Sequence, residues 1–178
     1  MAIHTGKVVW ITGLSGSGKS TLANGVVSRL RAKGEPVVML DGDALREVFN
    51  ATDANSLNHG REGRLALAMQ YARLSRTIAT QGITVVIATI SLFHEVHAWN
   101  RENLPGYFEV YLKVPLEELR RRDPKEIYRR FDAGELSHVA GLDLPVDEPA
   151  HPDLVMEFSP SQDADFIVSK LISTLDGR

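Results

Sequence analysis

Short apolar runs alternate with longer segments of helical periodicity along the chain. Runs rich in β-branched and other apolar residues predict buried strands at 8–12, 37–40, 83–90 and 107–114. The run at 83–90 is apolar or β-branched at every position, which is typical of a strand covered on both faces. Apolar residues at helical spacing predict helices at 20–33, 61–80 and 163–175.

Strands that alternate with helices predict an α/β fold, with a parallel β-sheet flanked by helices in three layers, α/β/α. Pro115 is expected to open a further short helix that ends near Arg121. Residues 122–152 are polar, contain turn residues and show little periodicity. Because this stretch is long for a plain connection, we expect a lid segment within it. The pattern does not divide the chain, so residues 1–178 are expected to form a single domain.

Composition and charge exclude several classes of function. Of the 178 residues, 43% are hydrophobic and 24% charged, as is usual for a globular protein. A net charge of -3 predicts no broad basic surface for nucleic acid or for a membrane. The absence of cysteine excludes disulfides, thiolate catalysis and cysteine-ligated zinc. No secretory signal or bilayer-spanning run is evident, so a cytoplasmic location is expected.

The segment Gly13–Ser20 follows G-x-x-x-x-G-K-S, the phosphate-binding loop of the P-loop NTPase fold. It lies between a predicted strand and a predicted helix, which is the context that the motif requires. Glycines let the loop wrap a phosphate with backbone N–H groups, and the helix N-terminus adds a favourable dipole. Lys19 is expected to reach the β- and γ-phosphates of ATP, and Ser20 to ligate Mg²⁺. The expected ATP-binding residues of this segment are Gly13, Ser15, Gly16, Ser17, Gly18, Lys19 and Ser20, together with Thr21, which directly follows it.

The loop alone does not separate kinases from other nucleotide-dependent proteins. The chain has no N-K-x-D motif, which argues against a Ras-like GTPase. It also lacks an ABC-type signature and is short for a motor protein. A small kinase is therefore favoured.

Two carboxylates follow the second predicted strand, in the segment Leu40-Asp41-Gly42-Asp43. Ligands bind at the carboxyl ends of the strands in open α/β sheets. Such carboxylates suit Mg²⁺ and an acceptor hydroxyl whose proton is accepted or oriented during attack on the γ-phosphate. Arg46 lies one helical turn beyond Asp43 and suits an anionic group of the substrate. The alternative is that Asp43 merely caps a helix at 44–50.

Several segments together resemble the adenylylsulfate kinase family. They are G-L-S-G-S-G-K-S-T-L-A from Gly13, L-D-G-D-x-x-R from Leu40, I-S-L-F from Ile90, R-D-P-K-E-I-Y from Arg122 and A-G-L-D from Ala140. The segments occur in the family's order, and the similarity extends from about Gly6 to Phe158. The family transfers the γ-phosphate of ATP to the ribose 3′-hydroxyl of adenylylsulfate, in sulfate assimilation. The resemblance implies the same reaction type here, with ATP and Mg²⁺.

The resemblance also implies roles for individual residues. The catalytic set is expected to be Lys19, Asp41, Asp43 and Ser91, with Ser20 and Asp41 at the metal. Arg122 and Lys125 are expected in a lid, with Arg122 on ATP; a solvated basic face is the alternative for the lid arginines. The acceptor is expected to contact Asp43, Arg46, Phe49, His59, Arg64, Ile90, Ser91, Lys125 and Val139. Family members are often dimeric, so a homodimer is an open expectation.

The sequence departs from the family on the acceptor side. In the family pattern D-R-x-x-N-I-R-R the first arginine is kept as Arg64, but Leu67 replaces the asparagine and uncharged residues replace the last two arginines. The two aromatic residues that clamp the adenine of adenylylsulfate correspond to His59 and Val139. Because a stacked base is worth on the order of 1–3 kcal/mol, the acceptor half differs more from the family than the ATP half does.

Three functions stay open on this evidence. The first is an adenylylsulfate kinase or a close relative. The second is a kinase for the ribose hydroxyl of cytidine diphosphoramidate, whose smaller pyrimidine needs a differently built clamp. The third is a nucleotide-binding regulatory domain without turnover, against which Lys19 and the two carboxylates argue. His94 and His97, which replace arginines of the family's I-S-P-F-R-x-D-R, have helical spacing, but no third metal ligand is evident.

Overall fold

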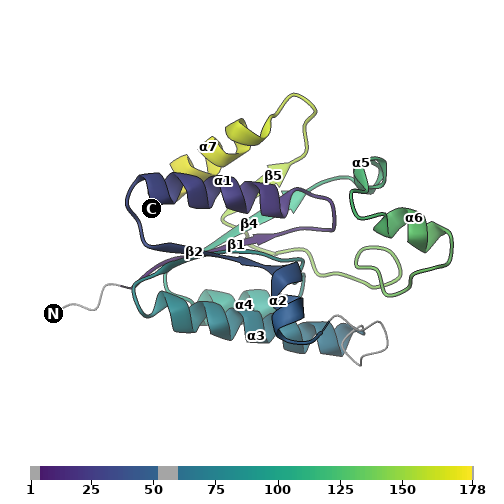
Figure 1. The fold of residues 1–178 in the computed structure, drawn as a ribbon, viewed down its shortest axis with the longest axis horizontal. Helices are drawn as coiled ribbons and strands as arrows, with labels where there is room; N and C mark the ends of the chain where they lie inside the picture. The colour runs from purple at the N-terminus through teal and green to yellow at the C-terminus, as the bar shows by residue number, and fades with distance from the viewer. Residues whose placement is uncertain (1–4, 52–59, 178) are drawn as a thin grey trace.

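A parallel β-sheet forms the centre of the computed structural model, which describes residues 5–51 and 60–177 (Figure 1). Within these residues the sheet has five strands in the order β2-β3-β1-β4-β5. They are β1 (Val8–Thr12), β2 (Val37–Asp41), β3 (Thr84–Ala88), β4 (Tyr107–Lys113) and β5 (Leu154–Glu157). Each neighbouring pair is parallel, which confirms the predicted sheet. The edge strand β5 was not predicted.

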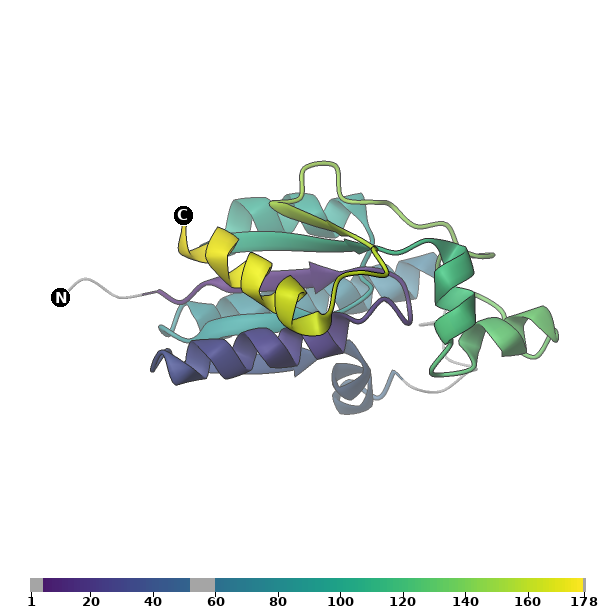
Figure 2. The ribbon, with the colours of Figure 1, turned by 90° about the horizontal axis from the view of Figure 1, so that it is seen from above.

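Helices cover both faces of the sheet and complete the predicted three layers (Figure 1). They are α1 (Lys19–Ala32), α2 (Gly42–Val48), α3 (Arg61–Ala79), α4 (His94–Asn103), α5 (Leu116–Arg122), α6 (Ile127–Asp132) and α7 (Ala164–Asp176). α1 and α7 lie on one face, and α3 and α4 lie on the other (Figure 1). Figure 2 shows α5 and α6 beyond the carboxyl ends of the strands.

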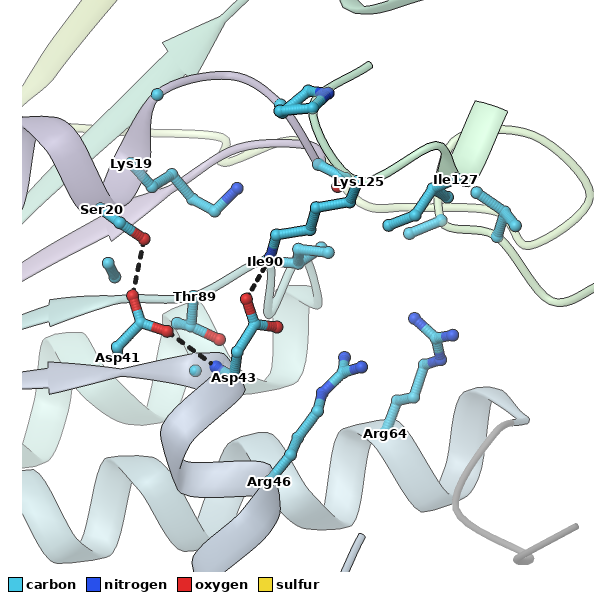
Figure 3. Close-up of a pocket in the computed structure, with 18 of the residues that line it drawn as sticks. Lys19, Ser20, Asp41, Asp43, Arg46, Arg64, Thr89, Ile90, Lys125 and Ile127 are labelled. Carbon is cyan, nitrogen blue, oxygen red and sulfur yellow. Dashed lines mark hydrogen bonds and ion pairs between the residues drawn. The ribbon is translucent and has the colours of Figure 1, made fainter. Parts of the chain in front are cut away.

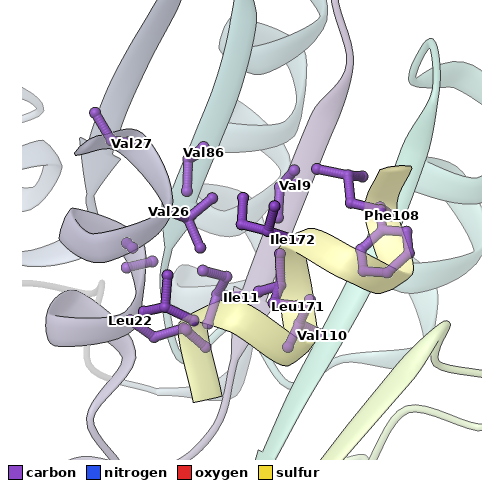
Figure 4. Packing of buried hydrophobic residues seen from close by; sticks show 14 of the residues in the cluster. Val9, Ile11, Leu22, Val26, Val27, Val86, Phe108, Val110, Leu171 and Ile172 are labelled. Atoms are coloured by element: carbon purple, nitrogen blue, oxygen red, sulfur yellow. The ribbon is translucent and has the colours of Figure 1, made fainter. Parts of the chain in front are cut away.

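The central strand β1 contributes to two separate cores. Successive side chains of a strand point to opposite faces of the sheet. Val9 and Ile11 therefore pack with α1 and α7 (Figure 4). Val8 and Trp10 pack with α3 and α4 on the other face. All four side chains are fully buried, so β1 and the phosphate loop that follows it are held from both sides.

Two helices, α4 and α6, were not predicted because their sequences lack the regular spacing of apolar residues that marks a helix. On α4, the polar residues His97 and Asn100 take buried positions that helical patterns normally give to apolar residues. α6 has six residues, fewer than two turns, and falls inside the polar stretch 122–152. α7 follows its predicted range closely, and Asp163 caps it by accepting a hydrogen bond from the Phe166 amide at 2.8 Å.

Candidate active site

The phosphate loop joins the end of β1 to the start of α1. Gly16 and Gly18 have φ values of 78° and 96°, in the left-handed region that favours glycine. Such a backbone lets successive N–H groups face a common hollow, as anion binding requires. The Lys19 ammonium lies across the loop and donates to the Leu14 carbonyl oxygen at 2.7 Å. The loop and its lysine are therefore arranged to receive a phosphate.

Asp41 joins the phosphate loop to the second strand. Ser20 donates its hydroxyl hydrogen to Asp41 Oδ2 at 2.6 Å, and Asp41 Oδ1 accepts from the Asp43 amide at 2.9 Å (Figure 3). Asp41 is thus the N-cap of α2, which begins at Gly42. The alternative in which Asp43 caps this helix is therefore wrong, because α2 begins at Gly42 and its N-cap is Asp41, two residues earlier.

The Asp43 carboxylate pairs with Lys125, which comes from the segment after α5 (Figure 3). Partial burial alone raises the pKa of Asp43, but the hydrogen bond and charge of Lys125 lower it below its usual value, aided by Arg46 and Lys19. Burial lowers the pKa of Lys19 to about 8, and the charge of Lys125 adds to this effect. The site therefore holds an ionised carboxylate beside a lysine that releases its proton near pH 8.

A cavity of about 390 Å³ opens at the carboxyl ends of β1, β2 and β3. Residues predicted to bind ATP, metal or acceptor supply much of its lining, namely Ser15, Gly16, Gly18, Lys19, Ser20, Thr21, Asp41, Asp43, Arg46, Arg64, Ile90, Lys125 and Val139. A smaller cavity of about 30 Å³ shares Arg46, Arg64 and Ile90 with it and is also lined by Ser91 and Leu67. Predicted residues far apart in the sequence thus meet in one hollow.

Arg46 and Arg64 point into this hollow from neighbouring helices (Figure 3). Arg64 donates to the His138 carbonyl oxygen at 2.6 Å. Burial lowers the pKa of Arg64, and the charge of Arg46 lowers it further. Two guanidinium groups whose positive charges repel each other in this way favour the binding of an anionic group between them.

Four predicted residues lie elsewhere in the structure. Gly13 and Ser17 belong to the phosphate loop without lining the hollow. Arg122 pairs with Glu118 at 2.6 Å and stacks over the Phe158 ring, 4.7 Å from its centroid. Phe49 packs against Tyr71, with ring centroids 5.9 Å apart. His59 lies outside the described residues.

Sequence reasoning missed several lining residues. Thr89 precedes Ile90 at the carboxyl end of β3, where the argument that singled out Asp41 applies equally. Leu136 and His138 come from the irregular stretch after α6, where no periodicity or motif marked them. Their positions depend on how that stretch folds back over the sheet, which no local pattern encodes.

The oxygen atoms of Ser20 and Asp41 suit a hard divalent cation. Mg²⁺ takes few protein ligands and completes its octahedral shell with phosphate oxygens and water. Within residues 5–51 and 60–177 no group of three or more His, Asp or Glu side chains is placed to hold a metal ion. The His94 ring contacts the Glu148 carbonyl, and the His97 ring contacts the Ser91 carbonyl, so each ring has a backbone partner of its own. In the same residues, no helix has the length and apolar character needed to cross a bilayer.

Comparisons with known proteins agree with this geometry. A family-wide sequence profile described as adenylylsulphate kinase matches residues 5–157. The chain is 39% identical over 153 residues to an adenylyl-sulfate kinase of Deinococcus deserti, covering 86% of this chain and 82% of that protein. It is 35% identical over 152 residues to a cytidine diphosphoramidate kinase of Campylobacter jejuni, covering 85% and 86%.

A solved structure extends the likeness to three dimensions. The APS kinase of Mycobacterium tuberculosis, in complex with AMPPNP and APS, matches with a TM-score of 0.85 and 35% identity. The match covers 97% of this chain and 98% of that one. Profile, relatives and fold therefore point the same way as the phosphate loop and the acidic strand end. The chain belongs to the adenylylsulfate kinase family and is an ATP-using phosphotransferase whose acceptor is a hydroxyl group.

Proposed function

We propose that the protein transfers the γ-phosphate of ATP, with Mg²⁺, to the ribose 3′-hydroxyl of adenylylsulfate or a close analogue. The observation that carries this proposal is the convergence of Lys19, Asp43 and two arginines on one cavity (Figure 3). A phosphate loop alone fits any nucleotide-binding protein. A carboxylate and a paired cationic site facing the same loop fit a kinase with an anionic acceptor.

The ATP half of the reaction falls to the phosphate loop. Its backbone N–H groups would hold the β-phosphate, and Lys19 would neutralise charge on the β- and γ-phosphates. Ser20 and Asp41, whose oxygen atoms lie 2.6 Å apart, would hold Mg²⁺. The bound cation would withdraw charge from the phosphate oxygens during transfer.

Asp43 is proposed to accept or orient the proton of the acceptor hydroxyl. In the structure the Asp43 carboxylate is paired with Lys125, which lines the same cavity as the phosphate loop. When the acceptor hydroxyl reaches Asp43, Lys125 can turn its charge toward the phosphoryl group in transit. One carboxylate thus serves as the partner of Lys125 before binding and of the substrate after it.

Arg46 and Arg64 are proposed to hold the anionic linkage of the acceptor. Both line the main cavity and the smaller one behind it. Planar guanidinium groups match sulfate and phosphate oxygens with paired hydrogen bonds. Because Arg64 also donates to the His138 carbonyl, an acceptor bound here would contact the stretch 122–152 through this arginine.

Residues 122–152 are proposed to form the lid. In support, the Tyr128 hydroxyl donates to the Ser15 carbonyl oxygen of the phosphate loop at 2.8 Å. The Lys125–Asp43 pair ties the same stretch to the end of β2. Arg122 now stacks on Phe158, and it is proposed to leave that ring and contact ATP when ATP binds. A homodimer and a cytoplasmic location stay predictions, the first open to light scattering.

A specific observation favours cytidine diphosphoramidate as a second candidate acceptor. Val139, at a position where the family has a clamping aromatic, lines the cavity with an aliphatic side chain. An aliphatic wall offers less stacking to a purine than a phenylalanine does. The 35% identical relative from Campylobacter jejuni is a kinase for this compound. Both candidates present a ribose hydroxyl and an anionic linkage to the same groups.

The deciding experiment is ADP release with ATP and Mg²⁺, measured in parallel with adenylylsulfate and with cytidine diphosphoramidate. We expect turnover with adenylylsulfate, and Arg46→Ala is expected to raise the acceptor KM while leaving the KM for ATP unchanged. Turnover with the cytidine compound alone would transfer the assignment to the second candidate. ATP binding without turnover on either compound would contradict both and support a nucleotide-binding domain without catalysis.

A further inference from the structure

The turn that follows β3 has a strained backbone beside the acceptor side of the cavity. Ser91 has a φ of 30°, in the region where a residue other than glycine is held only by its surroundings. Thr89 and Ile90, immediately before it, line the main cavity, and all three line the smaller one. Any relaxation at Ser91 would therefore move the wall that faces the acceptor.

Contacts from two elements hold this turn. The Ser91 hydroxyl lies 2.7 Å from the Thr89 hydroxyl, and the Thr12 hydroxyl of β1 donates to the Ile90 carbonyl. The Ser91 carbonyl accepts from the Phe93 amide at 3.1 Å. It also lies 3.1 Å from Nε2 of His97, on α4. Because a carbonyl oxygen only accepts, His97 Nε2 must carry the hydrogen.

His97 lies beside a buried polar network and has no hydrogen-bond partner at Nδ1 among the described residues. The ring is 8% exposed, and its Nε2 lies 4.0 Å from Oε1 of Glu109 on β4. Glu109 is 2% exposed, accepts from the Tyr107 hydroxyl at 2.8 Å and pairs with Arg101 at 3.3 Å. Burial lowers the pKa of His97 to about 4, so the ring is neutral near pH 7 and its one N–H hydrogen serves the Ser91 carbonyl.

We propose that His97 is a positioning residue for the acceptor. Through the Ser91 carbonyl it keeps the strained turn 89–91 in place and so fixes the acceptor wall opposite the phosphate loop. The proposal rests on the proposed function, because the acceptor is the group that this wall faces. The family pattern has arginine at this position, so the role belongs to this chain and its histidine. A histidine that only filled the space between α4 and β4 would leave the turn unchanged when replaced by a side chain of similar size.

Two substitutions at this position separate the roles. His97→Leu fills the space without a donor, whereas His97→Gln retains an N–H group that can reach the Ser91 carbonyl. We expect His97→Leu to lower kcat/KM for the acceptor about tenfold, as the loss of one hydrogen bond would, and to leave the KM for ATP within about twofold. His97→Gln is expected to recover most of the loss. Ile172→Val, in the core on the opposite face, is the control for a general loss of stability.

A second measurement does not depend on knowing the acceptor. Amide hydrogen exchange of a peptide covering residues 89–93 is expected to be faster in His97→Leu and unchanged in His97→Gln and Ile172→Val. In Ser91→Gly the left-handed backbone is unstrained, so His97→Leu should accelerate exchange less in that background. This double variant also carries the test if His97→Leu alone fails to fold.

The outcomes are distinct. Unchanged exchange in His97→Leu, or equal losses in the leucine and glutamine variants, would overturn the positioning role. A parallel loss of acceptor kcat/KM in Ile172→Val would reduce the effect to general stability and also overturn it. Faster exchange in His97→Leu, combined with no turnover by the wild type on either acceptor, would refute the proposed function. The role of His97 in holding the turn 89–91 would then still stand.

Discussion

Replacing Asp41 by asparagine separates two tasks that one carboxylate performs. Oδ1 caps α2 by accepting from the Asp43 amide at 2.9 Å, and Oδ2 faces the Ser20 hydroxyl at 2.6 Å. Asparagine caps a helix about as well as aspartate does, so the free energy of unfolding of Asp41→Asn should change by only a few tenths of a kcal/mol. Alanine removes the cap, and Asp41→Ala should lose about 0.5–2 kcal/mol.

The two variants should behave alike toward the metal. With the asparagine oxygen at the cap, its NH₂ group faces Ser20 and points hydrogens at the place where Mg²⁺ is expected. A charged metal ligand contributes several kcal/mol, and a loss of about 3 kcal/mol corresponds to roughly a hundredfold in rate. Both variants should therefore show a kcat about a hundredfold lower, or need far more Mg²⁺ to reach the wild-type rate.

The assay pairs urea unfolding with kcat measured over a range of Mg²⁺ concentrations at fixed ATP. We expect Asp41→Asn to keep nearly wild-type stability and Asp41→Ala to be less stable, with the same loss of kcat or of Mg²⁺ affinity in both. A wild-type Mg²⁺ dependence in Asp41→Asn would refute the assignment of this oxygen to the metal. Equal destabilisation by asparagine and alanine would refute the capping role.

Three further predictions address the neighbouring groups. Asp43→Asn should lower kcat about 10²–10⁴-fold while calorimetry with a non-hydrolysable ATP analogue shows unchanged affinity; a matching loss of affinity would contradict its role at the hydroxyl. Since the pKa of Lys19 is lowered to about 8, the affinity of the wild type for ATP should be constant below that pH and fall as the pH rises through it. The Lys19→Met variant should bind ATP weakly at every pH. A wild-type ATP affinity that stays constant up to pH 10 would contradict this prediction. His97 has a folded-state pKa of about 4, below the unfolded 6.5, so its contribution to stability is complete above pH 6.5 and lost as the pH falls toward 4. The difference in pKa corresponds to roughly 3 kcal/mol at most. Unfolding of wild type and His97→Gln from pH 7.5 to 4 measures this loss, and two parallel stability curves would exclude it.

Much of the fold was predictable from local pattern. The strands β1 to β4 are short, apolar and bounded by turn residues, and the long helix α3 shows its period over many turns, so each stood out in the sequence. The phosphate loop carries its mechanism in its own residues, which makes it readable without a structure. Asp41 was found because the end of a parallel strand is a place where ligands gather.

What the sequence could not reveal depends on distant contacts. Lys125 lies 82 positions after Asp43, and no local property of either residue announces their pairing. His97 looks like a surface residue in an unremarkable polar helix until its contact with Ser91 is seen. The sequence alternative placed the helix cap at Asp43, whereas the structure has it at Asp41. The difference is two residues at a helix boundary, where sequence patterns are least informative.

The division of side chains along β1 has a consequence for how this enzyme can change over time. Val9 and Ile11 of β1 pack with α1 and α7. Leu67, Tyr71 and Phe93, which line the smaller cavity, pack in the core of the other face. Substitutions in one core need not be compensated in the other, because distant sites contribute nearly independently to stability. A lineage can therefore reshape the wall of the smaller cavity by altering one core while the core between α1, α7 and the sheet is inherited intact.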